Sequence, residues 1–197
     1  MSKRIVVLIS GNGSNLQSLI DKTKSHEIPG TIVHVFSSKS TAYGLERAKA
    51  ASIPTSVLSL KTYKDKHLTR EDFNKDLSAL VSDQKPDLVV LAGWMLILSE
   101  SFVNQFRGKL INLHPSMPGD IEGANAIERA YQEFLSGKRT KTGVMVHYVI
   151  PEVDKGEPIL FEKVDILPND SLNDLETRIH TVEHKLISLA VAKVLSD

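Results

Sequence analysis

Residues 5–20 read IVVLISGNGSNLQSLI and indicate the architecture of the chain. The run IVVLI is continuously apolar, which is typical of a strand that is buried on both faces. In the segment after it, apolar residues recur at the spacing of one helical face, namely Leu16, Leu19 and Ile20. Gly11 and Gly13 lie between the two patterns. A buried strand, a glycine turn and an amphipathic helix are the first unit of an α/β protein.

The same alternation continues along most of the chain. Strand patterns are predicted at residues 31–38, 55–60, 86–94 and 109–116. Helix patterns are predicted at residues 43–51, 73–83, 99–108 and 126–137. The charged connection at 61–72 is interpreted as a solvated loop. Strands that alternate with helices of this length predict a mostly parallel sheet with helices on both faces.

The C-terminal part changes character. Strands predicted at 142–150 and 158–167 are joined by too few residues for a parallel crossover, so they should pair antiparallel at one edge of the sheet. Residues 171–195 predict a long amphipathic helix with a capping-type start. Its start is formed by Ser171 and Asp174, and its apolar stripe by Leu175, Ile179, Val182, Leu186 and Leu189. We therefore expect a Rossmann-like three-layer sandwich, a twisted sheet of about seven strands, in one domain over residues 1–197.

The bulk composition narrows the function. Lys+Arg and Asp+Glu each total 24, and the resulting net charge of zero disfavours a nucleic-acid-binding protein. The chain has no cysteine, which excludes disulfides, thiolate metal sites and cysteine nucleophiles. Its N-terminal apolar run has five residues, too few for a signal-peptide core or a membrane span. We expect a soluble, cytoplasmic protein with no membrane partner.

The glycine turn suggests a phosphate site of limited size. A dinucleotide fingerprint would need a third glycine where this chain has Leu16, and an acidic residue where the second strand pattern ends in FSSKS. The P-loop pattern fails as well. Gly11 and Gly13 still allow backbone N–H groups to approach an anion, and Ser14 and Asn15 could cap the helix. A plain strand-to-helix turn with Asn15 as N-cap remains the alternative.

The stretch INLHPS contains residue types that are suited to acid–base chemistry. Strand alternation puts Asn112 and His114 on the same side, at the carboxyl end of a predicted strand, where α/β sheets bind ligands. An amide donor and a protonated imidazole together can stabilise an oxyanion. Asp154, in the turn PEVDKGEP, could support the charged imidazole. The alternatives are a histidine and an aspartate that only bond their own turns. His147 is interpreted as a core or supporting histidine.

Two further patterns bear on ligands. The segment GWMLIL at residues 93–98 could form an apolar slot for a flat ring, although core packing is the alternative for its aliphatic side chains. The seven histidines show no metal-ligand spacing and no acidic cluster accompanies them, so no metal site is predicted.

Taken in order, six segments resemble one family: VVLISGNGSNLQSLID, AYGLERA, PDLVVLAGWMLIL, INLHPSMPG, VHYVIPEVDKGEPI and VEH. They are similar to the phosphoribosylglycinamide formyltransferases, the glycinamide ribonucleotide transformylases of purine biosynthesis, and most of all to the single-function fungal form. The resemblance runs from about residue 4 to residue 190. It implies one formyltransferase domain with a phosphate-binding half at about 1–100 and a folate and catalytic half at about 101–197.

The resemblance also implies a role for each matching residue. Asn112, His114 and Asp154 match the catalytic set, and Glu183 would reach the ribose hydroxyls. The substrate phosphate would be held by Gly11, Asn12, Gly13, Ser14 and Asn15. The folate would contact Arg70, Met95, Leu96, Ile97, Leu98 and Asn112.

The implied reaction moves the formyl group of 10-formyltetrahydrofolate, a consumed co-substrate, to the free amine of glycinamide ribonucleotide. The products are formyl-glycinamide ribonucleotide and tetrahydrofolate, in the de novo route to IMP. No metal or nicotinamide cofactor is implied, the partners are small molecules, and we expect a monomer or homodimer. Two alternatives stay open: transfer to another amine or hydrolysis of formyltetrahydrofolate, and a nucleotide-binding oxidoreductase domain. The missing third glycine counts against the oxidoreductase.

Overall fold

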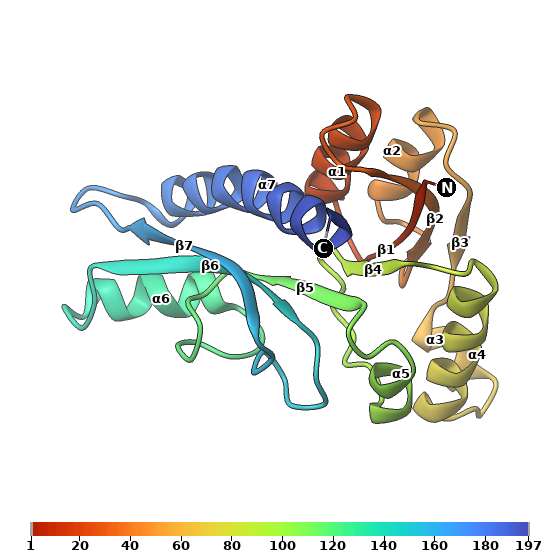
Figure 1. The fold of residues 1–197 in the computed structure, drawn as a ribbon. Helices are drawn as coiled ribbons and strands as arrows, with labels where there is room; N and C mark the ends of the chain where they lie inside the picture. Colours follow the sequence, from red (N-terminus) through yellow and green to blue (C-terminus); the bar gives the residue numbers. More distant parts are fainter. Residues whose placement is uncertain (1, 197) are drawn as a thin grey trace.

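The computed structural model describes residues 2–196. Within them the chain forms one seven-stranded sheet of order β3-β2-β1-β4-β5-β6-β7 (Figure 1). The strands are β1 (Lys3–Ile9), β2 (Gly30–Ser37), β3 (Thr55–Val57), β4 (Leu88–Leu91), β5 (Leu110–His114), β6 (Lys141–Tyr148) and β7 (Pro158–Asp165). The helices are α1 (Ser14–Lys24), α2 (Gly44–Ala50), α3 (Leu60–Asp65), α4 (Arg70–Asp83), α5 (Glu100–Gln105), α6 (Ala126–Leu135) and α7 (Leu172–Ser196).

Strand directions confirm the predicted sheet. The five strands β1 to β5 run parallel to one another, whereas β6 pairs antiparallel with β5, and β7 antiparallel with β6. The strand order reverses between β1 and β4, and ligands of open α/β sheets bind in the crevice beyond the carboxyl ends at such a point.

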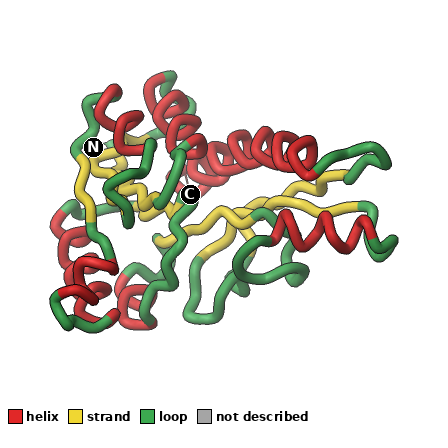
Figure 2. The backbone as a smooth tube through the Cα atoms, turned by 180° about the vertical axis from the view of Figure 1, so that it is seen from behind, coloured by secondary structure: helices red, strands yellow, loops and turns green. Residues whose placement is uncertain are grey.

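Helices cover both faces of the sheet, which confirms the three-layer arrangement (Figure 2). The odd-numbered β1 side chains, such as Ile5 and Val7, pack with α1, α2 and α7, whereas Val6 and Leu8 pack with α3, α4 and α5. Helix α6 contacts α7 at the antiparallel end. The alternation explains why β1 reads as a continuous apolar run, since each face of the strand meets its own core.

Two local predictions were wrong. The connection at 61–72 is not a loop throughout: it contains most of α3, whose Leu60 and Tyr63 pack against the core, and the first turn of α4. In α7, Leu189 lies outside the buried stripe and is 50% exposed. The helix packs on α1 and on β6 and β7 together, so its buried face turns towards Ile187 and Val191 instead. The predicted start of α7 is confirmed, because Ser171 and Asp174 exchange hydrogen bonds.

No helix among residues 2–196 is long and apolar enough to cross a membrane.

Candidate functional site

Three segments meet beyond the carboxyl ends of β1, β2 and β4, and Ser10 joins them. The Ser10 backbone N–H donates to the Gly93 carbonyl at 3.0 Å. Its hydroxyl accepts from the Ser38 hydroxyl at 2.7 Å and from the Met95 backbone N–H at 2.9 Å. The glycine turn after β1 and the segment after β4 therefore lie together, as the carboxyl-end rule predicted.

The glycine turn leaves the start of α1 without a side-chain cap. Gly13 is the N-cap residue, with a left-handed φ of 76°, and no side chain accepts a hydrogen bond from the first helical N–H groups. The predicted capping by Ser14 or Asn15 was therefore wrong, because the helix already begins at Ser14. Uncapped N–H groups at the positive end of a helix are a ready site for an anion.

The turn is braced by α2, which the sequence did not indicate. The Gly44 N–H donates to the Gly11 carbonyl at 3.1 Å, and a Cβ on Gly13 would lie 2.5 Å from the Gly44 Cα. The Arg47 guanidinium donates to both the backbone and the side-chain oxygen of Asn12, each at 3.0 Å. These contacts fix the turn from behind and leave the N–H groups of α1 free.

Glu183 of α7 reaches the same turn from the other end of the chain. Its carboxylate accepts a hydrogen bond from the Asn15 side chain at 3.1 Å, and the residue is only 6% exposed. Burial raises the pKa of Glu183, although the Asn15 hydrogen bond and nearby His180 act in the opposite direction. Asn15 Oδ1 is buried without a partner. A buried carboxylate beside an anion site is suited to accept hydrogen bonds from hydroxyl groups.

A cleft of about 390 Å³ opens between the segment after β4 and the β5–β6 side of the sheet. Met95, Leu96, Ile97 and Leu98 line it together with Trp94, the sole tryptophan. Met95 and Ile97 are largely exposed, at 73% and 61%, which is unusual for core residues. An apolar wall with few polar groups is typical of a small-molecule site.

The polar residues that line this cleft are Asn112, His114, Asn125, His147 and Asp154. Asp154 Oδ2 lies 3.5 Å from His114 Nδ1, and Oδ1 lies 3.3 Å from Asn112 Nδ2. Asn112 and His114 are two residues apart on β5, so strand alternation puts both on the cleft side. Asp154 has a left-handed φ of 55°, a conformation that aspartate tolerates better than most residues.

Asp154 is held as a carboxylate. Burial acts to raise its pKa, but contacts with His147, the Gly123 backbone N–H at 2.8 Å and the charge of His114 outweigh this and lower the pKa below its ordinary value. The cleft therefore contains a fixed negative charge against an imidazole, the pairing that orients a general acid.

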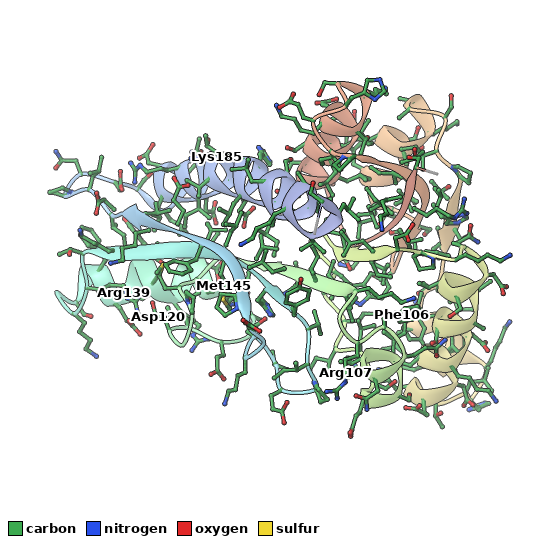
Figure 3. All side chains as sticks on the ribbon, viewed as in Figure 1. Phe106, Arg107, Asp120, Arg139, Met145 and Lys185 are labelled. Carbon is green, nitrogen blue, oxygen red and sulfur yellow. The ribbon has the colours of Figure 1, made fainter. Side chains whose placement is uncertain are left out.

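The other nitrogen of His114 also has a partner. His114 Nε2 donates to the Ile121 carbonyl at 2.7 Å, because a carbonyl can only accept. Ile121 in turn is fixed by its backbone N–H, which donates to Ser116 Oγ at 3.0 Å. Arg139 anchors the same segment through two hydrogen bonds to Asp120, and both labels lie close together in Figure 3.

The predicted site residues fall into two groups in the structure. One group surrounds the start of α1, namely Gly11, Asn12, Gly13, Ser14, Asn15 and Glu183. The other lines the cleft, namely Met95, Leu96, Ile97, Leu98, Asn112, His114 and Asp154. Arg70 is exposed at the first residue of α4 and is not among the residues that line the cleft. Among residues 2–196, no three His, Cys, Asp or Glu side chains are grouped to hold a metal ion.

Sequence reasoning missed the two residues that brace the glycine turn, Gly44 and Arg47. His147, which the sequence indicated as a core or supporting histidine, is buried and contacts Asn112. The segment AYGLERA entered the sequence argument only as a matching motif, because neither charge nor periodicity points from α2 to the turn.

Comparison with known proteins agrees with this geometry. A family model described as "Formyl transferase" matches residues 3–191, so the chain belongs to the formyl transferase family. A phosphoribosylglycinamide formyltransferase of Dictyostelium discoideum is 46% identical, over 100% of this chain and 99% of its own. The enzyme of the same name from Schizosaccharomyces pombe is 43% identical over the same shares. Within the family, the chain thus falls among the phosphoribosylglycinamide formyltransferases.

Solved structures agree as well. The phosphoribosylglycinamide formyltransferase of Bacillus halodurans superimposes with a TM-score of 0.91 at 32% identity, covering 99% of this chain and 96% of that one. Glycinamide ribonucleotide transformylase 1 of Geobacillus kaustophilus also gives a TM-score of 0.91, at 31% identity, covering 99% and 100%.

Proposed function

We propose that the protein transfers the formyl group of 10-formyltetrahydrofolate to the free amine of glycinamide ribonucleotide, giving formyl-glycinamide ribonucleotide and tetrahydrofolate. The observation that carries the proposal is the convergence of Asn112, His114 and Asp154 in one cleft. The full-length similarity to enzymes named for this activity supports it.

Each substrate has its own part of the site in this proposal. The 5′-phosphate binds at the uncapped start of α1, and Glu183 accepts hydrogen bonds from the ribose hydroxyls. The pteridine ring enters the cleft along Met95–Leu98, where backbone groups and apolar side chains hold it, and Arg70 contacts the folate. The phosphate-binding half then spans about residues 1–100 and the folate and catalytic half about residues 101–197.

The chemistry follows from the polar groups. The substrate amine attacks the formyl carbon, and the carbonyl oxygen becomes an oxyanion in a tetrahedral intermediate. Asn112 Nδ2–H and the protonated His114 stabilise this oxyanion, while Asp154 keeps the imidazole charged and oriented. The bond from the formyl carbon to the folate nitrogen then breaks. The proton lost by the amine passes to that nitrogen through His114 or water.

The contact between His114 and Ile121 has a part in this sequence. The Ile121 carbonyl accepts the Nε2–H in the free protein, so this contact must open before the Nε2–H can serve the oxyanion. The reaction needs neither a metal nor a nicotinamide cofactor. The protein acts on these two small molecules in the cytoplasm, as a monomer or homodimer.

The test is a formyl-transfer assay with purified protein, glycinamide ribonucleotide and 10-formyltetrahydrofolate, followed by the change in folate absorbance. Asn112→Ala or His114→Ala should each lower kcat about 10²-fold or more, the scale of one oxyanion donor or acid–base group. His67→Ala and Asn104→Ala, on exposed positions away from the cleft, are the matched controls.

Near-normal kcat in both cleft variants would contradict the catalytic assignment. Release of formate without formyl transfer would instead indicate a hydrolase, and transfer only to a different amine would contradict the substrate.

A further inference from the structure

His147 lies directly across the strand pair from Asn112. The two residues are opposite partners in the antiparallel β5–β6 ladder, and His147 is 2% exposed. The ladder between β6 and β7 shifts register between Val146 and His147. Irregularities of this kind re-aim side chains next to active sites. The imidazole therefore points into the polar corner of the cleft although it belongs to a buried strand.

The hydrogen bonds of His147 define which ring nitrogen carries the proton. Nδ1 lies 2.9 Å from the Tyr148 carbonyl oxygen, which can only accept, so Nδ1 is the protonated nitrogen. In the neutral ring, Nε2 is then an acceptor. It lies 3.2 Å from Asn112 Nδ2, which can only donate. Nε2 also lies 3.6 Å from Asp154 Oδ1, farther than it lies from Asn112 Nδ2, so the amide is its nearer partner. The contacts at the two ring nitrogens are consistent with one tautomer and one orientation of the Asn112 amide.

We propose that His147 is a positioning residue that fixes the orientation of the Asn112 amide for formyl transfer. The proposal rests on the function proposed above. One Nδ2 hydrogen of Asn112 goes to His147 Nε2, and the other lies on the side of Asp154, 3.3 Å from Oδ1. During formyl transfer this second hydrogen leaves Asp154 Oδ1 and is donated to the oxyanion.

The opposite orientation of the amide would fail for electrostatic reasons. It would place Asn112 Oδ1 next to the Asp154 carboxylate and the developing oxyanion, so that three acceptors would face one another with no hydrogen between them. An Nε2 acceptor on His147 excludes this arrangement, because two acceptors would then also meet at the His147 contact. The Tyr148 carbonyl thus keeps the His147 proton on Nδ1, and the unprotonated Nε2 in turn orients the Asn112 amide.

The kinetic test compares two variants of His147. His147→Phe keeps a ring but removes the acceptor, and should lower kcat about 10²-fold while both KM values change less than about threefold. His147→Gln supplies a side-chain carbonyl that accepts in place of Nε2, and should restore most of the lost kcat. In an Asn112→Ala background, His147→Phe should cause almost no further loss, since the amide that it orients is absent.

A purely structural role for His147 predicts different results. Both variants would then lose activity in proportion to their thermal stability, and the losses in the double variant would add. Either result overturns the proposal.

A second measurement uses the unaltered protein and does not depend on activity. The ¹⁵N chemical shifts of the His147 ring at neutral pH should show protonated Nδ1 and unprotonated Nε2, and a hydrogen-bonded Asn112 amide should give a shifted ¹⁵N resonance. The reverse tautomer would overturn the proposal even where His147→Phe fails to fold. If the NMR spectra show the expected tautomer but the protein does not transfer formyl groups, the proposed function is rejected and the role of His147 in orienting the Asn112 amide is retained.

Discussion

The Asn15 side chain donates a hydrogen bond to the Glu183 carboxylate at 3.1 Å, although 168 residues separate the two in the chain. This contact joins the start of α1 to the middle of α7. It also leaves Asn15 Oδ1 buried with no partner and keeps a carboxylate out of water. The free protein is therefore less stable here than it could be, and the polar groups are kept ready for a ligand.

Glu183→Gln should stabilise the free protein and weaken substrate binding. The new amide no longer carries the desolvated charge whose burial raises the pKa of Glu183, and it can donate to Asn15 Oδ1. Satisfying one buried group is worth about 1–3 kcal/mol, or roughly 2–4 °C in Tm per kcal/mol for a domain of this size. Affinity for glycinamide ribonucleotide should fall about tenfold.

Thermal unfolding and ligand titration of the two proteins check this. Glu176→Gln, on a half-buried position of the same helix, is the matched control. A lower Tm with unchanged affinity would show that Glu183 is structural only.

Gly13→Ala should mainly lower the stability of the protein, whereas Gly11→Ala should mainly affect substrate binding. A Cβ on Gly13 meets the Gly44 Cα at 2.5 Å and requires a left-handed backbone, so Gly13→Ala should destabilise the protein by about 2 kcal/mol or more. A Cβ on Gly11 meets nothing within 4 Å. Gly11→Ala should therefore leave Tm unchanged and raise KM for glycinamide ribonucleotide, if the phosphate approaches this backbone. Unchanged kinetics in Gly11→Ala would place the phosphate elsewhere.

Trp94 should report on folate binding. It is the only tryptophan of the chain and lines the cleft next to Met95. A folate ligand should change its fluorescence in a saturable manner, whereas glycinamide ribonucleotide alone, bound at the start of α1, should change it much less. Trp94→Phe supplies the background signal. Equal responses to both ligands would contradict the division of the site.

Asp154→Asn should remove a stabilising charge as well as activity. Because the folded-state pKa of Asp154 is below its ordinary value of 3.8, its contribution to stability is complete above that value and disappears as the pH falls through the lower folded pKa. The difference in unfolding free energy between wild type and Asp154→Asn should therefore be larger at neutral pH than in acid. We expect a loss in kcat of roughly 10²–10⁴-fold.

Urea unfolding at several pH values and steady-state rates measure both effects. A stability difference that grows on acidification would contradict the direction of the pKa shift.

The sequence predicted the sheet well because its signals are local. Apolar runs, glycine turns and helical spacing each lie within one element, and the rule for carboxyl ends then brings the segments near Gly11, Met95 and His114 together. The short helix α3 was missed because Leu60 and Tyr63 hold it through tertiary packing and not through a long periodic pattern.

The missed parts of the site depend on relations between distant segments. The contact of His147 with Asn112 requires the register of β5 on β6, and the brace from Gly44 requires the packing of α2 on the glycine turn. Neither register nor helix approach can be read from a single sequence. Glu183 was assigned to the site only through the family resemblance. Carboxylates are rarely buried, so the sequence alone does not indicate that Glu183 lies buried among the apolar residues of α7.

Strand β5 pairs parallel with β4 on one side and antiparallel with β6 on the other. Asn112 is therefore opposite Leu91 of β4 and opposite His147 of β6. The spacing of the amide and the imidazole is therefore that of a strand repeat within a rigid ladder, while Asp154 and Ile121 sit on turns. Changes in the turns can alter which molecules are accepted without moving the two groups on the strand. Substrate selectivity thus depends on the turns and the reaction rate on the two side chains of β5, so the two properties can diverge independently among related enzymes.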